Sequence, residues 1–294
     1  GLRPRLEVLG AALLFSTGGA AIKGCQLSAW QVASFRCAVA GLFFWALLPA
    51  VRRGGLSGRV WLVGLAYAST LTAYVQSNKA TTAANAIFLQ SASPLYLLLL
   101  APLLLRERVR RSDLLVMVTM AIGLALCFGG PQPPSETAPD PAAGNLWGLA
   151  AGLAWALTVL GLRWLAGGGD ASDAPRAVVC GNVLGALVAL PFALPEGAAS
   201  LEGARLADGA WILYLGVVQI GLAYLLLTRG VREVPAFEAS LLLLVEPVLS
   251  PIWTWWLHGE TPGAGTFSGG ALILAATVWR AWLAGRPDGD SGRP

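Results

Sequence analysis

Ten stretches of this chain are apolar over roughly the 20 residues that an α-helix needs to cross the hydrocarbon core of a bilayer. The runs are continuous, as from Tyr96 to Leu105, whereas a strand that faces lipid alternates apolar and polar residues. Because lipid offers backbone groups no hydrogen-bond partner, each run has to form a helix. The sequence therefore predicts an all-α integral membrane protein with ten transmembrane helices, over residues 6–24, 29–50, 60–78, 82–105, 114–130, 145–166, 176–194, 209–229, 234–257 and 264–284.

The composition supports the membrane class and excludes several others. Hydrophobic residues make up 56% of the chain and charged residues 12%, where soluble domains carry about 25%. The net charge of +4 comes from basic residues that lie between the apolar runs, so we expect the lipid bilayer and not a nucleic acid as partner. The four cysteines stand singly and His258 is the one histidine, which predicts no disulfide framework, no metal and no cofactor.

The chain repeats itself at a fixed distance. Residues Pro94 and Pro247 interrupt two apolar runs and lie 153 residues apart, as do Glu107 and Glu260. Lys79 and Arg232 have the same spacing, so the two halves correspond. Paired interruptions of this kind are typical of the midplane site of a secondary transporter. We expect a first five-helix repeat at 1–130, a proline-rich external linker at 131–143, a second repeat at 144–285 and a polar cytoplasmic tail at 286–294.

The distribution of charge predicts the orientation. With the N-terminus in the cytoplasm, 16 of the 20 lysines and arginines fall on the cytoplasmic side. Both termini are then cytoplasmic, and since five spans are an odd number, the second repeat is inverted relative to the first. We expect a multi-pass protein of the bacterial inner membrane, monomeric because ten helices suffice to enclose a cavity.

Four segments resemble the drug/metabolite transporter superfamily, in its ten-helix EamA-type branch: Trp30–Ala40, Ala83–Glu107, Gly144–Leu157 and Glu233–Glu260. The resemblance implies two inverted five-helix repeats around a central cavity, lined mainly by helices 1–4 and 6–9, with helices 5 and 10 at the periphery. It also implies a secondary transporter that exports small metabolites by alternating access. Aromatic or other neutral amino acids are the expected cargo, and a multidrug or nucleotide-sugar carrier is the alternative.

The prolines also indicate where a site would lie. Each removes a backbone donor and frees the carbonyl four residues earlier, that of Gln90 for Pro94 and that of Leu243 for Pro247. Such carbonyls need a wet cavity or protein partners. Glu246, halfway along the ninth span, also needs compensation, as a proton-coupling group, as a site for a substrate ammonium, or as a structural partner of Arg36. Arg36 itself lies near the start of its span, where its long stem allows the guanidinium to reach the interface.

A pocket that binds a small molecule is mostly apolar, with a few hydrogen-bonding groups. Along the third span, Tyr67, Thr70, Tyr74 and Asn78 recur at three- and four-residue intervals, a stripe that we expect to face the bundle interior. Lys79 at the end of that span is either a carboxylate-attracting group or an interfacial anchor. The complete set of candidate cavity residues is Phe15, Tyr67, Tyr74, Asn78, Lys79, Gln90, Ser93, Tyr96, Trp155, Gln219, Tyr224 and Glu246, with Pro94 and Pro247 as helix breaks.

Other functional classes find less support in the residues. A membrane-embedded enzyme needs a cluster such as paired histidines or a serine beside a base, and no span contains one, so we expect no catalytic residues. A receptor or scaffold is typically built with larger extramembrane segments than these. A nucleotide-sugar pocket needs several basic residues around the phosphates, whereas Arg36 is the one arginine well inside a span.

Overall fold

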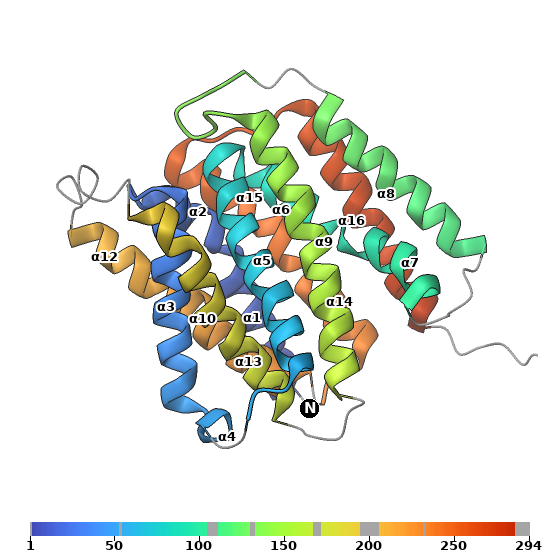
Figure 1. Cartoon of the computed structure of the whole chain (residues 1–294). Coiled ribbons are helices and arrows are strands. Elements are labelled where there is room, and N and C mark those ends of the chain that lie inside the picture. The colour runs from blue at the N-terminus through green and yellow to red at the C-terminus, as the bar shows by residue number, and fades with distance from the viewer. Residues whose placement is uncertain are drawn as a thin grey trace, which may run out of the picture.

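The computed structural model describes residues 2–52, 55–104, 111–129, 133–166, 172–194, 206–231 and 233–285. In these residues the chain is helical and forms no strand beyond an isolated bridge between Ser135 and Ala138. Figure 1 shows the helices packed side by side in one bundle. Glu107, Arg232 and the predicted tail at 286–294 lie outside the described residues.

The first half contains five helical rods, two of which are broken. They are α1 (Leu2–Ser16) with α2 (Gly18–Gly24), α3 (Ala29–Leu47) followed by the short α4 (Pro49–Arg52), α5 (Gly58–Ala80), α6 (Ala83–Ser91) with α7 (Ser93–Leu104), and α8 (Arg111–Gly129).

The second half of the described chain repeats this order. Its rods are α9 (Pro141–Ala166), α10 (Asp173–Ala193), α12 (Leu206–Leu213) continued by the π-helix η1 (Tyr214–Leu222) and α13 (Ala223–Gly230), α14 (Ala236–Leu243) with α15 (Val245–His258), and α16 (Ala264–Gly285). The ten rods correspond to the ten predicted spans. The exact boundaries of the two repeats and of the linker stay a prediction.

Seven of the described helices are long and apolar enough to cross a membrane, and α8 is a shorter apolar helix. The remaining rods, α5 with 23 residues and α16 with 22, are equally long but carry more polar residues. The fold is therefore the all-α membrane architecture that the sequence predicts.

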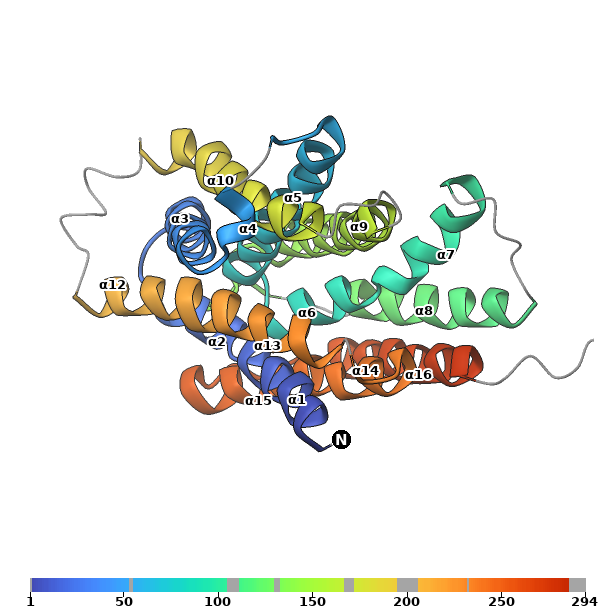
Figure 2. The same cartoon turned by 90° about the horizontal axis from the view of Figure 1, so that it is seen from below.

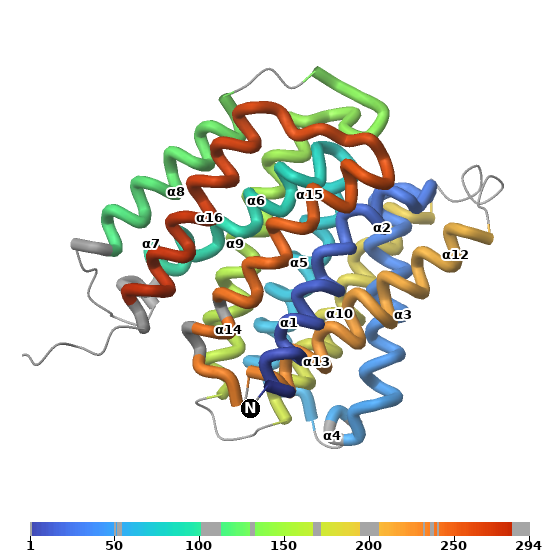
Figure 3. Tube along the Cα trace, turned by 180° about the vertical axis from the view of Figure 1, so that it is seen from behind, coloured from blue at the N-terminus to red at the C-terminus, as the bar shows by residue number. Residues whose placement is uncertain are grey.

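Contacts between the halves come in matched pairs. The third rod (α5) packs against the sixth (α9). The eighth rod (η1 and α13) packs against the first rod (α1) and the second (α3). In the same way, α6 packs on α9 while α15 packs on α1 and α2, and α8 lies along α16. Figures 2 and 3 show α5, α9 and α10 on one side of the molecule and α1, α14 and α15 on the other. This pairing is what two related halves around a central axis produce.

The helices α8 and α16, the last of each half, approach closely through two glycines. A β-carbon on Gly123 would lie 2.8 Å from the Gly269 carbonyl oxygen, and one on Gly269 would lie 2.4 Å from the Gly123 carbonyl oxygen. Small residues let transmembrane helices come this close, and close approach supplies most of their packing energy in lipid. Both helices therefore form a fixed edge of the bundle.

Each proline break lies at the middle of its rod. In the first half, α6 ends at Ser91 and α7 begins at Ser93, just before Pro94. In the second half, α14 and α15 are separated by a break at Leu244, which precedes Pro247. Both prolines thus occupy the first turn of a new helix, where a backbone amide has no intrahelical partner anyway. The breaks cost little in this position, and neither proline can donate a hydrogen bond to the carbonyl four residues earlier, that of Gln90 or that of Leu243.

Candidate functional site

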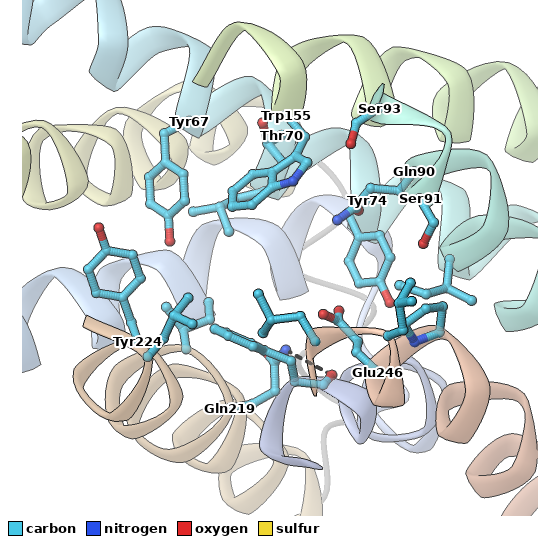
Figure 4. A pocket seen from close by; sticks show the side chains of 18 of the residues that line it. Tyr67, Thr70, Tyr74, Gln90, Ser91, Ser93, Trp155, Gln219, Tyr224 and Glu246 are labelled. Atoms are coloured by element: carbon cyan, nitrogen blue, oxygen red, sulfur yellow. Dashed lines mark hydrogen bonds between the residues drawn. The ribbon is translucent and has the colours of Figure 1, made fainter. Parts of the chain in front are cut away.

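A cavity of about 270 Å³ lies at the level of the two helix breaks. Its walls come from both halves: from α1, α3, α5, α6 and α7 of the first, and from α9, η1, α13, α14, α15 and α16 of the second. The Gln90 and Leu243 residues, whose carbonyls the prolines free, both line it. Figure 4 shows the side chains converging from opposite walls.

Most of the predicted site residues line this cavity. They are Phe15, Tyr67, Tyr74, Gln90, Ser93, Pro94, Trp155, Gln219, Tyr224, Glu246 and Pro247. In Figure 4, Trp155 stands above the centre, Tyr67 and Tyr224 turn their hydroxyls toward each other on one side, and Tyr74 and Glu246 lie together on the other. Aromatic surface therefore covers one part of the cavity and polar groups the other.

Three predicted residues lie away from the cavity lining. Asn78 is fully buried in helix packing, where its Nδ2 donates to the Tyr74 carbonyl at 3.1 Å. The Lys79 ammonium donates to the Cys25 carbonyl, which ties α5 to the loop after α2. The Tyr96 ring packs toward α9, 3.2 Å from the place that a β-carbon on Gly152 would occupy. The stripe on α5 thus faces the cavity at Tyr67, Thr70 and Tyr74 and leaves it one turn later.

Several lining residues were not among the predicted set, namely Arg36, Thr70, Leu71, Ile87, Ser91, Ile220, Leu227, Leu243, Leu244 and Thr277. Thr70 belongs to the predicted stripe, and its Oγ1 lies 3.3 Å from that of Thr158 on α9. Thr277 shows that α16 reaches the cavity, although the resemblance implied a peripheral tenth helix. The apolar residues carry no signal that separates them from lipid-facing leucines.

Arg36 does not reach an interface. Its side chain is buried, with 1% of the residue exposed, and its Nη2 donates to the Leu71 carbonyl at 2.8 Å. Its Nε has no hydrogen-bond partner in the part of the chain that the structure describes. The expectation of an outward-reaching stem was wrong, because α5 passes close enough to offer a backbone acceptor in the interior.

Glu246 occupies the first turn of α15, directly after the break. The free amides of a helix N-terminus favour negative charge there. Among the described residues it forms no ion pair, in contrast with Glu7, Glu238 and Glu260. Nearby, Gln219 donates through Nε2 to the Phe15 carbonyl at 3.4 Å, the dashed line in Figure 4, while its Oε1 is buried without a partner. The cavity wall therefore contains acceptors together with one cation, Arg36, whose Nε has no hydrogen-bond partner among the described residues.

One end of the bundle, where residues 133–140 connect the halves, contains a buried polar cluster. The Lys23 ammonium lies 3.0 Å from Glu260, and each side chain is only 3% exposed. Glu260 also accepts a hydrogen bond from the Ala83 amide at 2.7 Å, and Lys23 donates to the Thr81 carbonyl at 2.9 Å. The cluster thereby joins α2 and the start of α6 to the segment that follows α15.

A family model described as the EamA-like transporter family matches residues 6–129 and 142–281. An uncharacterized transporter of Archaeoglobus fulgidus is 30% identical over 243 residues, which cover 81% of this chain and 83% of that protein. The pseudopaline exporter CntI of Pseudomonas aeruginosa is 26% identical over 275 residues, 91% of this chain and 92% of that one.

A solved crystal structure of a protein with 19% sequence identity superposes with a TM-score of 0.59 and covers 96% of this chain and 97% of its own. At that identity the likeness is one of fold. The match extends over nearly the full length of both chains, so the helices on both sides of the cavity are shared.

Proposed function

The chain belongs to the EamA-like transporter family, and from this we propose that it exports small metabolites, with aromatic or other neutral amino acids as cargo, by alternating access of two inverted repeats. That it is a membrane transporter follows from the family. The cargo, the direction and the mechanism are our proposal. So are its place in the bacterial inner membrane with both termini cytoplasmic, and its action as a monomer.

The single observation that carries the proposal is the cavity at the two helix breaks. Both halves contribute to it, and the corresponding prolines Pro94 and Pro247 lie on its wall. Unwound or interrupted helices at the midplane are where secondary transporters hold their cargo. Any motion of one half against the other changes the access to this cavity.

The size and composition of the cavity favour a small, partly apolar cargo. Its volume of about 270 Å³ lies just below the range of roughly 300–1,000 Å³ that is usual for drug-sized ligands. Trp155, Tyr67, Tyr224 and Phe15 supply apolar surface, and Gln90, Gln219 and Ser93 supply polar groups. This mixture suits an amino acid better than a large drug or a nucleotide sugar.

The buried polar cluster supports alternating access. The Lys23–Glu260 pair joins segments at one end of the bundle, which favours a conformation in which the cavity opens toward the opposite face. The matched contacts between the halves, such as α5 with α9 and α13 with α1, favour a second arrangement of similar energy in which the roles are exchanged.

The Pseudomonas relative favours a second candidate. Since that protein is a pseudopaline exporter and aligns over 91% of this chain, pseudopaline itself is the alternative cargo. A single guanidinium, Arg36, lines the cavity in the described part of the chain, which favours a carboxylate over the several phosphates of a nucleotide sugar.

The test is transport by purified protein in proteoliposomes. Radiolabelled phenylalanine, leucine, glutamate and pseudopaline are offered with and without a pH gradient. We expect movement of phenylalanine and leucine, saturable and absent from protein-free liposomes. Movement of none of the four probes contradicts the proposed cargo, and movement of pseudopaline alone selects the second candidate.

Proton coupling through Glu246 is tested in the same assay. A proton-coupled exporter responds to the pH gradient, and the Glu246→Gln variant should lose this response, because its amide cannot release a proton. Glu7→Gln, an acidic residue of α1 outside the cavity, is the matched control. An unchanged pH response in Glu246→Gln contradicts the coupling role and leaves facilitated export.

A further inference from the structure

The cavity contains two opposite charges that are not paired with each other. Arg36 comes from α3 in the first half, and Glu246 comes from α15 in the second. No ion pair joins them or links either one to another charged side chain within the described ranges. Buried charges are normally paired, because an isolated one is costly to remove from water.

The guanidinium of Arg36 is held but not satisfied. One of its nitrogens donates to the Leu71 carbonyl, which fixes the group in place, and Nε has no partner in the described residues. A neutral carbonyl accepts a hydrogen bond without balancing the charge. A planar guanidinium can donate two parallel hydrogen bonds to one carboxylate.

The carboxylate of Glu246 lies beside a tyrosine of the cavity wall. Figure 4 shows the Tyr74 hydroxyl and the Glu246 carboxylate side by side at one end of the cavity. Arg36 lines the same cavity, and in the described residues it forms no ion pair with Glu246. The two charged groups are therefore presented to one space without neutralising each other.

Aromatic side chains contribute a large share of the remaining wall. Trp155, Tyr67 and Tyr224 lie away from Glu246 in Figure 4, and Phe15 lines the same space. A ligand with a positive and a negative end and an apolar side chain would meet matching surface in all three directions.

We infer that the cavity binds zwitterions, with the cargo's carboxylate on Arg36, its ammonium on Glu246 and its side chain against Trp155 and the facing tyrosines. The inference rests on the proposed function and names the groups that recognise the cargo. One α-amino acid with a hydrogen bond at each charged end spans roughly 8 Å, which bridges charges too far apart to pair directly. A cargo with one charge leaves either Arg36 or Glu246 in the cavity wall without a charged partner.

Three probes of similar shape separate the two contacts. Phenylalanine carries both charges, phenethylamine lacks the carboxylate, and 3-phenylpropanoate lacks the ammonium. Competition against labelled phenylalanine is measured with the purified wild-type protein in proteoliposomes. We expect both analogues to compete at least about tenfold more weakly than phenylalanine, since each loses a charged hydrogen bond. Equal competition by either analogue overturns the inference without the use of any variant.

Variants then assign each end. Arg36→Gln should weaken phenylalanine and 3-phenylpropanoate at least about tenfold and leave phenethylamine unchanged, while Glu246→Gln should weaken phenylalanine and phenethylamine and leave 3-phenylpropanoate unchanged. Arg36→Lys retains the charge and should recover part of the carboxylate preference. Arg176→Gln, a buried arginine of α10 outside the cavity, and Glu7→Gln are matched controls that should change no probe.

The outcomes distinguish this inference from the proposed function. If wild-type protein moves none of the amino acids, the proposed cargo fails and the inference fails with it. If phenylalanine is moved but a variant weakens all three probes equally, the inference alone is overturned. Thermal unfolding in detergent shows whether each variant is folded, and a misfolded variant leaves the wild-type competition result to decide.

Discussion

At the scale of single residues, Trp155 is the largest side chain that the second half directs into the cavity. It projects from α9 opposite Gln219 and between the tyrosines and Tyr74 (Figure 4). Buried aromatic side chains with one polar edge often contribute most of the energy at a binding site, because they offer a large rigid surface. If the cavity holds the cargo, this residue has to contact it.

Trp155→Ala should therefore raise the half-saturating phenylalanine concentration about tenfold or more in the proteoliposome assay. Trp256→Ala is the matched control, because that indole is 71% exposed on the outer surface of the bundle. We expect the control to transport like wild type. Equal half-saturation in Trp155→Ala and wild type would place the cargo elsewhere.

The Lys23–Glu260 pair gives a second prediction at this scale. Lys23→Met leaves a buried carboxylate, and Glu260→Gln leaves a buried ammonium, so each single variant should lose about 3–5 kcal/mol of stability. The double variant should lose less than the sum, since Gln at 260 can still accept from the Ala83 amide. Thermal and denaturant unfolding in detergent measures the stability of the two single variants and the double variant, and so gives the coupling free energy of this double-mutant cycle.

The pair Arg3–Glu7 on α1 is the control cycle, because the Arg3 side chain is 89% exposed. No measurable coupling is expected there. Strictly additive losses for Lys23 and Glu260 would show that the buried contact contributes nothing and that the segments at this end are held together by packing alone.

The sequence indicated most of the residues that line the cavity, including Glu246, but not Arg36. Tyr67 and Tyr74 follow helical periodicity, and Glu246 stands out because carboxylates are rare inside spans. Asn78 shares the periodicity of that stripe and Lys79 follows it, yet the helix ends at Ala80 and the Lys79 side chain contacts the loop at Cys25 instead. The position of Arg36 depends on how closely α3 approaches α5, which is a tertiary property that one sequence does not contain.

At the scale of helices, the broken rods are the mobile elements that the account requires. Pro247 in the first turn of α15 permits the break at Leu244, but it also prevents a continuous helix, because it offers no donor to the Leu243 carbonyl. Pro94 likewise offers no donor to the Gln90 carbonyl. The sequence predicted both breaks, since proline acts locally.

Pro247→Ala should favour the straight helix, with a backbone hydrogen bond worth about 1 kcal/mol that the native chain cannot form. We expect unfolding to occur at the same or a higher temperature and phenylalanine transport to slow at least several-fold. Pro141→Ala at the first residue of α9 is the control, because its position has no intrahelical partner in either case. Wild-type transport by Pro247→Ala would show that the break has no role in turnover.

The π-helix η1 was not predicted. It runs from Tyr214 to Leu222 in the middle of the eighth rod and carries Gln219 into the cavity wall. The corresponding rod α5 is α-helical throughout. The π-helix packs closely against α3, since a β-carbon on Gly216 would lie 2.5 Å from Val39 and one on Gly221 would lie 2.5 Å from Phe43. Such contacts depend on the tertiary structure, and the pattern of apolar residues along the chain does not contain them. Such widened turns are frequent at functional sites.

At the scale of the whole molecule, the two halves surround a cavity, and a buried polar cluster joins their helices at the end where residues 133–140 connect them. The ten rods and their all-α packing were predictable from apolar length alone. Their mutual arrangement was predicted through the internal repeat and the family resemblance. Under the proposed alternating access, the end that carries this cluster opens in a second conformation while the other end closes.

Access to the cavity from each face is the most direct measurement of this claim. A cysteine at Ser91, a small residue of the cavity wall, is treated with a membrane-impermeant maleimide added to one side or the other of oriented vesicles. The four native cysteines are buried, so background labelling is expected to be low. The account predicts labelling from both sides in separate experiments, slowed by saturating phenylalanine. Labelling from one side only, at a rate that phenylalanine does not change, would contradict it.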